Sequence, residues 1–261
     1  MNIFITGSEG FIGSHLVEKL INDGHKIKAL VQYNSFGNIG HLQYLKNKYK
    51  KKIKIVFGDI RDVEFLNKNI KGSKIVIHLA ALIAIPYSYD AMESYIETNI
   101  KGTFNVIKSS IKNKIKHIVI TSTSEVYGSA QSIPISENHR LLGQSPYSAT
   151  KIAADQIALS FFYSFNAPIT ILRPFNTFGP RQSLRAVIPS IIVQCLKKNK
   201  KIKLGDINTT RDFNFVEDIV ESFSKVLNKR NTFGKVINIG SNFEISIKDL
   251  CKIIIDLTNS N

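Results

Sequence analysis

Residues 2–13 read Asn2-Ile3-Phe4-Ile5-Thr6-Gly7-Ser8-Glu9-Gly10-Phe11-Ile12-Gly13, a short apolar segment that runs directly into three evenly spaced glycines. The apolar part predicts a buried strand, and residues 14–22, closed by Gly24, predict a helix. In such a turn the first glycine permits the tight bend, the second lets the backbone approach a pyrophosphate, and the third lets the helix pack on the sheet. Because free N–H groups at a helix start attract anions, the stretch predicts a dinucleotide-binding unit, with an ordinary glycine turn as the alternative.

Strand-like and helix-like segments alternate along the rest of the chain. The strand-like segments are short, apolar and mostly β-branched, and they cover residues 27–31, 53–57, 75–79, 118–121, 169–172 and 236–239. Apolar strands separated by helices predict an α/β fold with a doubly wound parallel sheet that is covered on both faces. Ligands of such sheets bind beyond the carboxyl ends of the strands. The residues that follow each strand are therefore the candidates for function.

Candidate binding residues lie at or just after the ends of three of these strands. They are Gln32, Asn34 and Ser35 after strand 27–31, Asp59 and Ile60 after strand 53–57, and Leu79, Ala80 and Ala81 at the end of strand 75–79. An NAD site usually has an acidic residue after the second strand; since none is present here, the amide and hydroxyl groups can also accommodate a 2′-phosphate. The Asp59 carboxylate either accepts a hydrogen bond from an adenine amino group or caps a helix. The alanines let a backbone lie against a ligand.

Tyr147 and Lys151 lie four residues apart, which places both on one face of a helix. An ammonium group there can lower the pKa of the phenol and make it a base near neutral pH, whereas the alternative is a solvated helix face. The fifth strand ends at Thr121 and is followed by Thr123 and Glu125. A hydroxyl and a carboxylate are therefore expected to face the same crevice as Tyr147.

Composition narrows the class of protein. The chain has 261 residues, 43% of them hydrophobic, which is enough for a sizeable core in one or two domains. Much of the net charge of +15 lies in residues 46–54 and 197–201; these runs are typical of solvated loops and lack the clustered arginines and aromatic residues of a nucleic-acid site. No segment is typical of a membrane span or a signal peptide, so we expect a cytoplasmic protein. Cys195, Cys251 and six scattered histidines predict neither a disulfide nor a metal site.

Together with His78 and the segment Arg173-Pro174-Phe175-Asn176, these motifs closely resemble the extended short-chain dehydrogenases/reductases of the NAD-dependent epimerase/dehydratase family. The resemblance covers essentially the whole chain. It implies a Rossmann domain over residues 1–175 and a smaller carboxyl-terminal substrate domain over 176–261, with a strand near 236–240 returning to the main sheet. It also implies a nucleotide-sugar substrate, NAD as cofactor with NADP as the alternative, and a homodimer formed through the helices around 103–111 and 147–162.

The resemblance also assigns the cofactor site. The residues implied are Gly7, Gly10, Phe11, Ile12, Gly13, Gln32, Asn34, Ser35, Asp59, Ile60, Leu79, Ala80, Ala81, Asn99, Thr121, Tyr147, Lys151, Arg173 and Pro174. Asn99 matches the asparagine that in this superfamily helps orient the lysine through water, and the alternative is a helix-interior amide.

The catalytic residues implied are Thr123, Ser124, Glu125, Tyr147 and Lys151. By resemblance, Tyr147 takes the proton of the sugar 4-hydroxyl while the C4 hydride passes to nicotinamide, and Thr123 bonds the reacting oxygen. Glu125 is placed as the base of a dehydratase, which removes the C5 proton so that the C6 hydroxyl leaves as water. The best-known sugar 4,6-dehydratases have Asp at the position of Ser124, so either Glu125 serves both steps or water assists.

Longer motifs are most similar to the N-acetylglucosamine 4,6-dehydratases of legionaminic-acid-type biosynthesis, which act on UDP- or GDP-linked sugars. The alternatives are a nucleotide-sugar 4-epimerase or a UDP-glucuronate decarboxylase on the same scaffold, and a non-catalytic dinucleotide-binding module. The substrate-binding residues implied are Ile83, Pro86, Glu125, Asn176, Arg181, Val187, Ile188 and Arg211, with a surface salt bridge as the alternative for each arginine. Relatives of this type continue beyond the position of Asn261, so we expect a substrate domain that is truncated.

Overall fold

The structure is a computed structural model that describes residues 1–45, 47–197 and 201–260. Parts of both lysine-rich runs, at Lys46 and residues 198–200, lie outside this range. The strands are β1 (Asn2–Thr6), β2 (Lys26–Gln32), β3 (Ile53–Gly58), β4 (Ile75–His78), β5 (His117–Thr121), β6 (Ile169–Pro174), β7 (Asn176–Phe178), β8 (Thr210–Phe215), β9 (Val236–Ile239) and β10 (Glu244–Ser246). The helices are α1 (Phe11–Asn22), α2 (Val63–Ile70), α3 (Ile85–Asp90), α4 (Met92–Tyr95), α5 (Gly102–Lys112), α6 (Pro146–Phe165), α7 (Val187–Leu196), α8 (Val216–Val226) and α9 (Ile247–Leu257).

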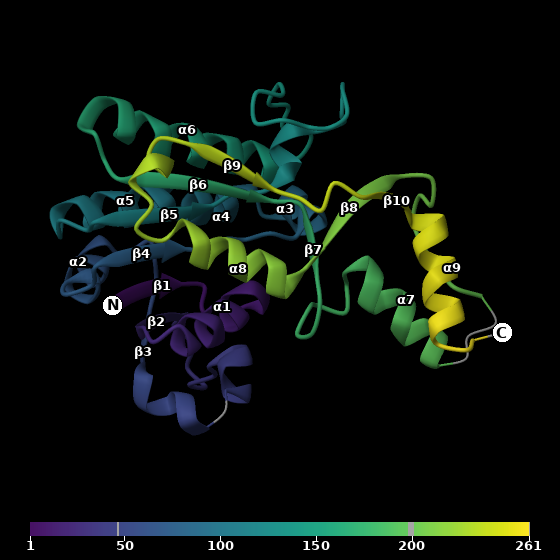
Figure 1. The fold of residues 1–261 in the computed structure, drawn as a ribbon, viewed down its shortest axis with the longest axis horizontal. Coiled ribbons are helices and arrows are strands. Elements are labelled where there is room, and N and C mark those ends of the chain that lie inside the picture. The colour runs from purple at the N-terminus through teal and green to yellow at the C-terminus, as the bar shows by residue number, and fades with distance from the viewer. Residues whose placement is uncertain (46, 198–200, 261) are drawn as a thin grey trace.

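Within the described ranges, the main sheet has seven parallel strands in the order β3-β2-β1-β4-β5-β6-β9 (Figure 1). This is the strand order of a doubly wound, Rossmann-type fold with one further strand at its edge. The predicted α/β class is confirmed, and each strand expected from the sequence is present. β9 lies beside β6, although the two strands are far apart in the sequence: β6 ends at Pro174 and β9 starts at Val236.

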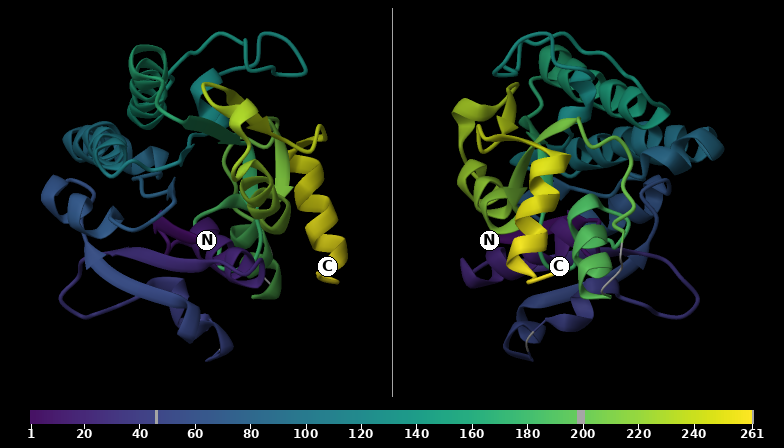
Figure 2. Two further views of the ribbon diagram at one scale, coloured as in Figure 1. Left: turned by 60° about the vertical axis from the view of Figure 1, so that its left-hand side comes forward. Right: turned by 90° about the vertical axis from the view of Figure 1, so that its right-hand side faces the viewer.

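Alternate residues of each buried strand face opposite helix layers. Ile3 and Ile5 of β1 pack with α1 and α8 on one face, whereas Phe4 packs with α2, α5 and α6 on the other. Figures 1 and 2 show these two helix layers on either side of the sheet. The strands are apolar on both faces because both faces are covered, as expected for a parallel sheet. The carboxyl ends of the strands are thereby fixed by core packing.

A smaller layer extends from the carboxyl edge of the main sheet. It contains the sheet β10-β8-β7 and the helices α7 and α9, which lie side by side in Figures 1 and 2. Ile191 and Cys195 of α7 and Ile254 of α9 form its buried apolar cluster. The sequence did not predict β7, β8 or β10, because β7 and β10 have only three residues each and β8 carries polar residues.

None of the helices in the described ranges is long and apolar enough to cross a membrane.

Candidate active site

The glycine loop between β1 and α1 has the shape that its sequence predicts. Gly7 has a φ of +66°, and a Cβ there would lie 2.7 Å from the Ala80 nitrogen. A Cβ on Gly13 would lie 2.1 Å from the Gly7 carbonyl oxygen, so Gly13 is what allows α1 to pack this closely. Gly10 meets only that oxygen, at 3.4 Å, and lines open cavity on its other side. The helix begins at Phe11, three residues earlier than predicted. The free N–H groups of its first turn therefore belong to the glycine motif.

Two cavities follow the carboxyl ends of the main-sheet strands. Their volumes are about 210 Å³ and about 620 Å³. Gly7, Gly10, Leu79 and Ala81 line both of them, so they form one continuous crevice that crosses the start of α1. A dinucleotide has this elongated form, with its pyrophosphate at the helix start. The open side of Gly10 therefore fits a dinucleotide cofactor.

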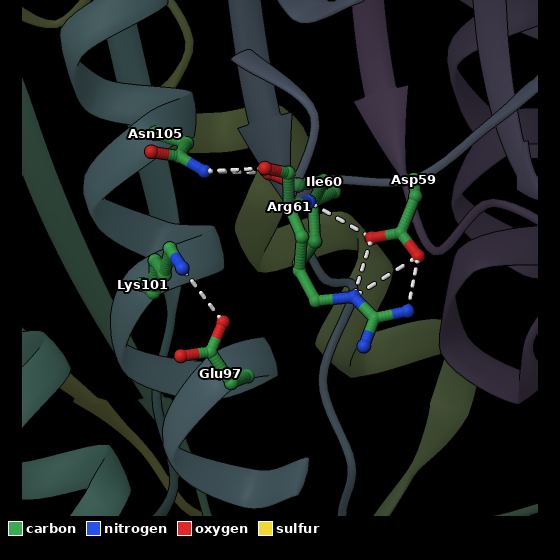
Figure 3. Close-up of polar contacts among 6 residues, drawn as sticks. All are labelled: Asp59, Ile60, Arg61, Glu97, Lys101 and Asn105. Carbon is green, nitrogen blue, oxygen red and sulfur yellow. Dashed lines mark hydrogen bonds and ion pairs between the residues drawn. The ribbon is translucent and has the colours of Figure 1, made fainter.

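Asp59 and Arg61 form the polar end of the smaller cavity (Figure 3). The Arg61 guanidinium donates to both carboxylate oxygens of Asp59 at 2.6–3.1 Å, and the Arg61 main-chain N–H donates at 2.8 Å. These hydrogen bonds hold the pKa of Asp59 below its ordinary value. Asp62, and not Asp59, caps α2 by accepting from the Phe65 N–H at 3.0 Å. The helix-cap alternative for Asp59 is thus wrong.

The segment after β2 contributes less than predicted. Gln32 lines the smaller cavity, but Asn34 and Ser35 do not. The Asn34 amide is engaged within its own loop, where it donates to the Asn38 carbonyl and accepts from the Asn38 N–H, both at 2.8 Å. An amide already committed to a turn is not free to bind a cofactor.

Thr123, Ser124, Glu125, Tyr147 and Lys151 all line the larger cavity. Thr123 caps the short helix Ser124–Tyr127 by accepting from the Glu125 N–H at 3.2 Å. Tyr147 lies in the first turn of α6, which starts with Pro146 and a capping box between Ser145 and Ser148. Two separate helix starts therefore bring the hydroxyl, the carboxylate and the phenol to one cavity.

The protonation of Tyr147 and Lys151 differs from the prediction. Burial raises the pKa of the Tyr147 phenol, the charges of Glu125 and Asp155 raise it further, and a hydrogen bond with Thr123 lowers it. The Lys151 ammonium donates to the Thr121 carbonyl at 2.6 Å, and burial lowers the pKa of this lysine. The expected lowering of the phenol pKa by Lys151 is not found, because desolvation dominates and the ammonium is bound to main chain.

A buried network of polar side chains holds both ends of the segment that contains Thr123, Ser124 and Glu125. Arg173 and Asp155 are paired at 2.9 Å, with side-chain exposures of 2% and 0%. Ser122 donates to Asp155 at 2.7 Å, and Arg173 donates to the Tyr127 hydroxyl at 2.9 Å. Arg173 does not line either cavity, so its predicted contact with the cofactor is not supported. It instead fixes the segments on either side of Thr123.

Most of the other predicted residues line one of the two cavities, whereas Asn99 does not. Phe11, Ile12, Gly13, Thr121, Pro174, Ile83, Pro86 and Asn176 line the larger cavity, and Ile60 and Ala80 line the smaller one. Asn99 lines neither; its amide bonds both the N–H and the carbonyl of Leu82 at 2.9 Å and donates to Thr150 at 3.1 Å. Asn99 thus anchors the backbone that forms one wall of the crevice.

Four predicted substrate residues lie away from the cavities. Arg181 is paired with Glu18 of α1 at 3.1 Å, and Arg211 donates to the adjacent Thr210 carbonyl at 2.8 Å. Val187 and Ile188 pack against the apolar cluster of α7 and α9. Arg181 forms the ion pair that its alternative describes, whereas Arg211 bonds neighbouring main chain instead. All four were assigned by motif position alone, and their contacts with a substrate remain predictions.

Several lining residues were not predicted from the sequence. Glu9, Arg61 and Thr98 line the smaller cavity, and Ser183 and Arg185 line the larger one. Glu9 stands within the glycine motif itself and is the one acidic side chain there, so its charge was a signal available from the sequence. Arg185 is the missed cation of the larger cavity; nothing in its local pattern separates it from Arg181.

The family model of GDP-mannose 4,6 dehydratase matches residues 4–260. The chain belongs to this family. The predicted membership of the extended short-chain dehydrogenases/reductases is confirmed, and curated relatives share it. The chain is 35% identical to a dTDP-D-glucose 4,6-dehydratase of Dictyostelium discoideum, over 98% of this chain and 62% of the relative. It is 32% identical to a UDP-N-acetyl-alpha-D-glucosaminuronate decarboxylase of Bacillus cytotoxicus, over 98% of this chain and 80% of the relative.

Solved members of the family have the same fold. A dTDP-glucose 4,6-dehydratase of Streptomyces venezuelae with NAD bound matches with a TM-score of 0.91 and 27% identity, over 100% of this chain and 82% of that one. A UDP-N-acetylglucosamine 4-epimerase of Methanobrevibacter ruminantium matches with a TM-score of 0.89 and 32% identity, over 100% and 83%. Family membership therefore covers dehydratases, decarboxylases and epimerases of nucleotide sugars.

Proposed function

We propose that this chain carries an NAD-dependent nucleotide-sugar 4,6-dehydratase that acts on UDP- or GDP-N-acetylglucosamine. The observation that carries the proposal is that Glu125 lines the same cavity as Thr123 and Tyr147. A 4-epimerase oxidises and reduces C4 and needs no carboxylate base. A carboxylate within the redox cavity is what proton removal at C5 requires.

The residues that would hold NAD follow the crevice from the smaller cavity to the larger one. Asp59 and Gln32 lie at the adenosine end, Gly10 at the pyrophosphate, and Lys151 near the nicotinamide end. When bound there, NAD supplies a reversible hydride acceptor. The NAD found in solved relatives supports this choice of cofactor.

In the proposed mechanism Tyr147 acts as its phenolate: because burial raises the pKa of this phenol, Tyr147 must lose its own proton before its oxygen takes the proton of the sugar 4-hydroxyl. The Thr123 hydroxyl bonds the same sugar oxygen. The C4 ketone acidifies the C5 hydrogen, and Glu125 removes that proton. Ser124 carries no acid, so the protonated Glu125 returns its proton to the departing C6 hydroxyl, which leaves as water. One carboxylate thus serves as base and then as acid. The 5,6-ene that remains takes one hydride at C6 and one proton at C5, and that proton replaces the one that Tyr147 removed from the 4-hydroxyl, so the protons balance.

The second candidate is a nucleotide-sugar 4-epimerase or a UDP-glucuronate decarboxylase. The observation that favours it is Ser124, which stands where the best-known dehydratases have a carboxylic acid. Relatives named as a decarboxylase and as a 4-epimerase have the same fold or sequence. Release of carbon dioxide from UDP-glucuronate, or interconversion of C4 epimers without loss of water, would identify these activities.

The test is mass spectrometry of UDP- and GDP-N-acetylglucosamine after incubation with the purified chain and NAD⁺ or NADP⁺. We expect one nucleotide sugar to lose the mass of one water, and Tyr147→Phe and Glu125→Gln each to abolish the loss. Tyr163→Phe is the matched control, because Tyr163 lies on the same helix as Tyr147 but is 73% exposed. A product of unchanged mass, with Glu125→Gln as active as the unaltered chain, would contradict the dehydratase.

The homodimer is also proposed, from an aromatic row that joins α5 and α6. Phe104 and Phe161 lie 5.9 Å apart, Phe161 and Phe165 lie 5.5 Å apart, and Phe165 is 68% exposed. A second copy covering this row would remove the exposed apolar surface from water. Light scattering should show a dimer that Phe104→Glu with Phe165→Glu converts to a monomer; a monomeric unaltered chain would refute it.

A further inference from the structure

Glu9 is held rigidly at the adenosine end of the crevice. Its Oε1 atom accepts from the Gln32 N–H at 2.8 Å, at the carboxyl end of β2, and its main-chain oxygen accepts from the His41 N–H at 2.9 Å. Gly40 packs against its backbone, since a Cβ on Gly40 would lie 2.7 Å from the Glu9 oxygen. A glycine-loop side chain therefore occupies the end of β2.

The Glu9 carboxylate retains hydrogen-bonding capacity. Its Oε2 atom is buried and has no partner among the residues that the structure describes. Glu9 lines the smaller cavity together with Gln32, Asp59 and Arg61. Asp59 differs from it, because the Arg61 guanidinium already occupies both oxygens of Asp59. Glu9 is thus a carboxylate beside this cavity with an unsatisfied oxygen, which a turn of the side chain towards the cavity would offer to a ligand.

We propose that Glu9 replaces the acidic residue that is missing after β2, that it accepts hydrogen bonds from the adenosine ribose hydroxyls, and that it selects NAD over NADP. This inference rests on the dinucleotide site of the proposed function. A 2′-phosphate would bring negative charge against the Glu9 carboxylate. Arg61 is neutralised by Asp59, and the Asn34 amide is committed to its own loop, so neither offsets that repulsion.

Burial also raises the pKa of Glu9, although its bond from the Gln32 N–H opposes this effect. A ribose hydroxyl that donates to the carboxylate stabilises the ionised form. We therefore expect cofactor binding to stabilise the ionised form of Glu9, and ionised Glu9 to strengthen cofactor binding.

The test measures binding without turnover. The intact chain is titrated calorimetrically with ADP-ribose and with 2′-phospho-ADP-ribose, which differ only at the ribose 2′-position. We expect ADP-ribose to bind at least about 100-fold more tightly. Glu9→Gln keeps an acceptor for the Gln32 N–H but removes the charge, and the ratio should fall at least about 10-fold.

Glu64→Gln is the matched control, because Glu64 lies exposed on α2 and lines neither cavity. It should leave the ratio unchanged, and the melting temperature of each variant checks that it is folded. An equal ratio in Glu9→Gln and the unaltered chain would overturn the proposal, as would equal binding of both probes or binding of neither. Because no sugar nucleotide is present, a ratio that falls as expected in Glu9→Gln, together with a failed water-loss assay, would refute only the dehydratase.

Discussion

The main sheet and the smaller carboxyl-terminal layer support the same crevice with very different cores. Both faces of the main sheet carry clusters of fully buried side chains from several strands and helices, whereas Ile191, Cys195 and Ile254 make up the buried cluster between α7 and α9. The proposed catalytic side chains stand on the first region, and Asn176 and Thr177 of β7, which line part of the larger cavity, belong to the second. The carboxyl-terminal layer is thus held by a much smaller buried core than the main sheet.

The largest effect is expected at the buried ion pair of the main region. Asp155→Ala leaves the Arg173 guanidinium buried without its partner, which should lower the free energy of unfolding by about 3–5 kcal/mol. Urea denaturation measures it. The control is Glu97→Gln, which breaks the exposed pair with Lys101 at 2.9 Å and should cost at most about 1 kcal/mol. Equal losses in both variants would contradict the role assigned to burial.

The next effect compares a glycine of each region. Gly13→Ala places a methyl group 2.1 Å from the Gly7 oxygen and should cost about 3 kcal/mol, because main chain must move. Gly205→Ala meets nothing within 4 Å and should change stability by about 0.5 kcal/mol or less. Thermal and urea unfolding of the two variants give the comparison. A Gly13→Ala chain of unchanged stability would show that α1 can shift freely.

A third effect depends on pH. His78 is buried between Thr6 and Thr103, at 2.7 Å and 2.9 Å, and burial lowers its pKa to about 3. Below the unfolded-state pKa of about 6.5, His78 is protonated in the unfolded chain but stays neutral in the folded chain. The free energy of unfolding therefore falls as the pH falls. Relative to His78→Gln, the unaltered chain should lose about 1.4 kcal/mol per pH unit between pH 6 and pH 4, to order of magnitude. If the free energies of unfolding of the unaltered chain and of His78→Gln changed equally with pH, this prediction would be refuted.

The smallest effect lies in the carboxyl-terminal layer. Ser246 caps α9 by accepting from the Asp249 N–H at 3.0 Å, so Ser246→Ala should cost about 1 kcal/mol. Hydrogen exchange should quicken in α9 while the main sheet keeps its protection. Ser222→Ala, within α8, is the control without a capping role. Equal loss of protection in the main sheet would mean that the two regions unfold together.

The sequence predicted the main region well because its signals are local. Glycine spacing, continuous apolar runs and the Tyr147 and Lys151 pair depend on neighbours within a few residues. Local patterns do not fix the outer assignments, because the position of those side chains depends on distant partners. Arg181 binds Glu18 and Arg173 binds Asp155, and neither choice is visible from residues near the arginine. Glu9 was missed because its significance depends on Gln32, which lies on the next strand.

The link between Tyr127 and Asn238 has a consequence for synthesis. The Tyr127 hydroxyl donates to the Asn238 side chain at 2.7 Å, and the Asn238 N–H donates to Glu137. Asn238 lies on β9, so it leaves the ribosome more than one hundred residues after Tyr127, which it supports. Chains fold from the amino end as they are made. The nascent protein can therefore assemble β1 to β6 early, but the segment around Tyr127 gains this support only after β9 has been made.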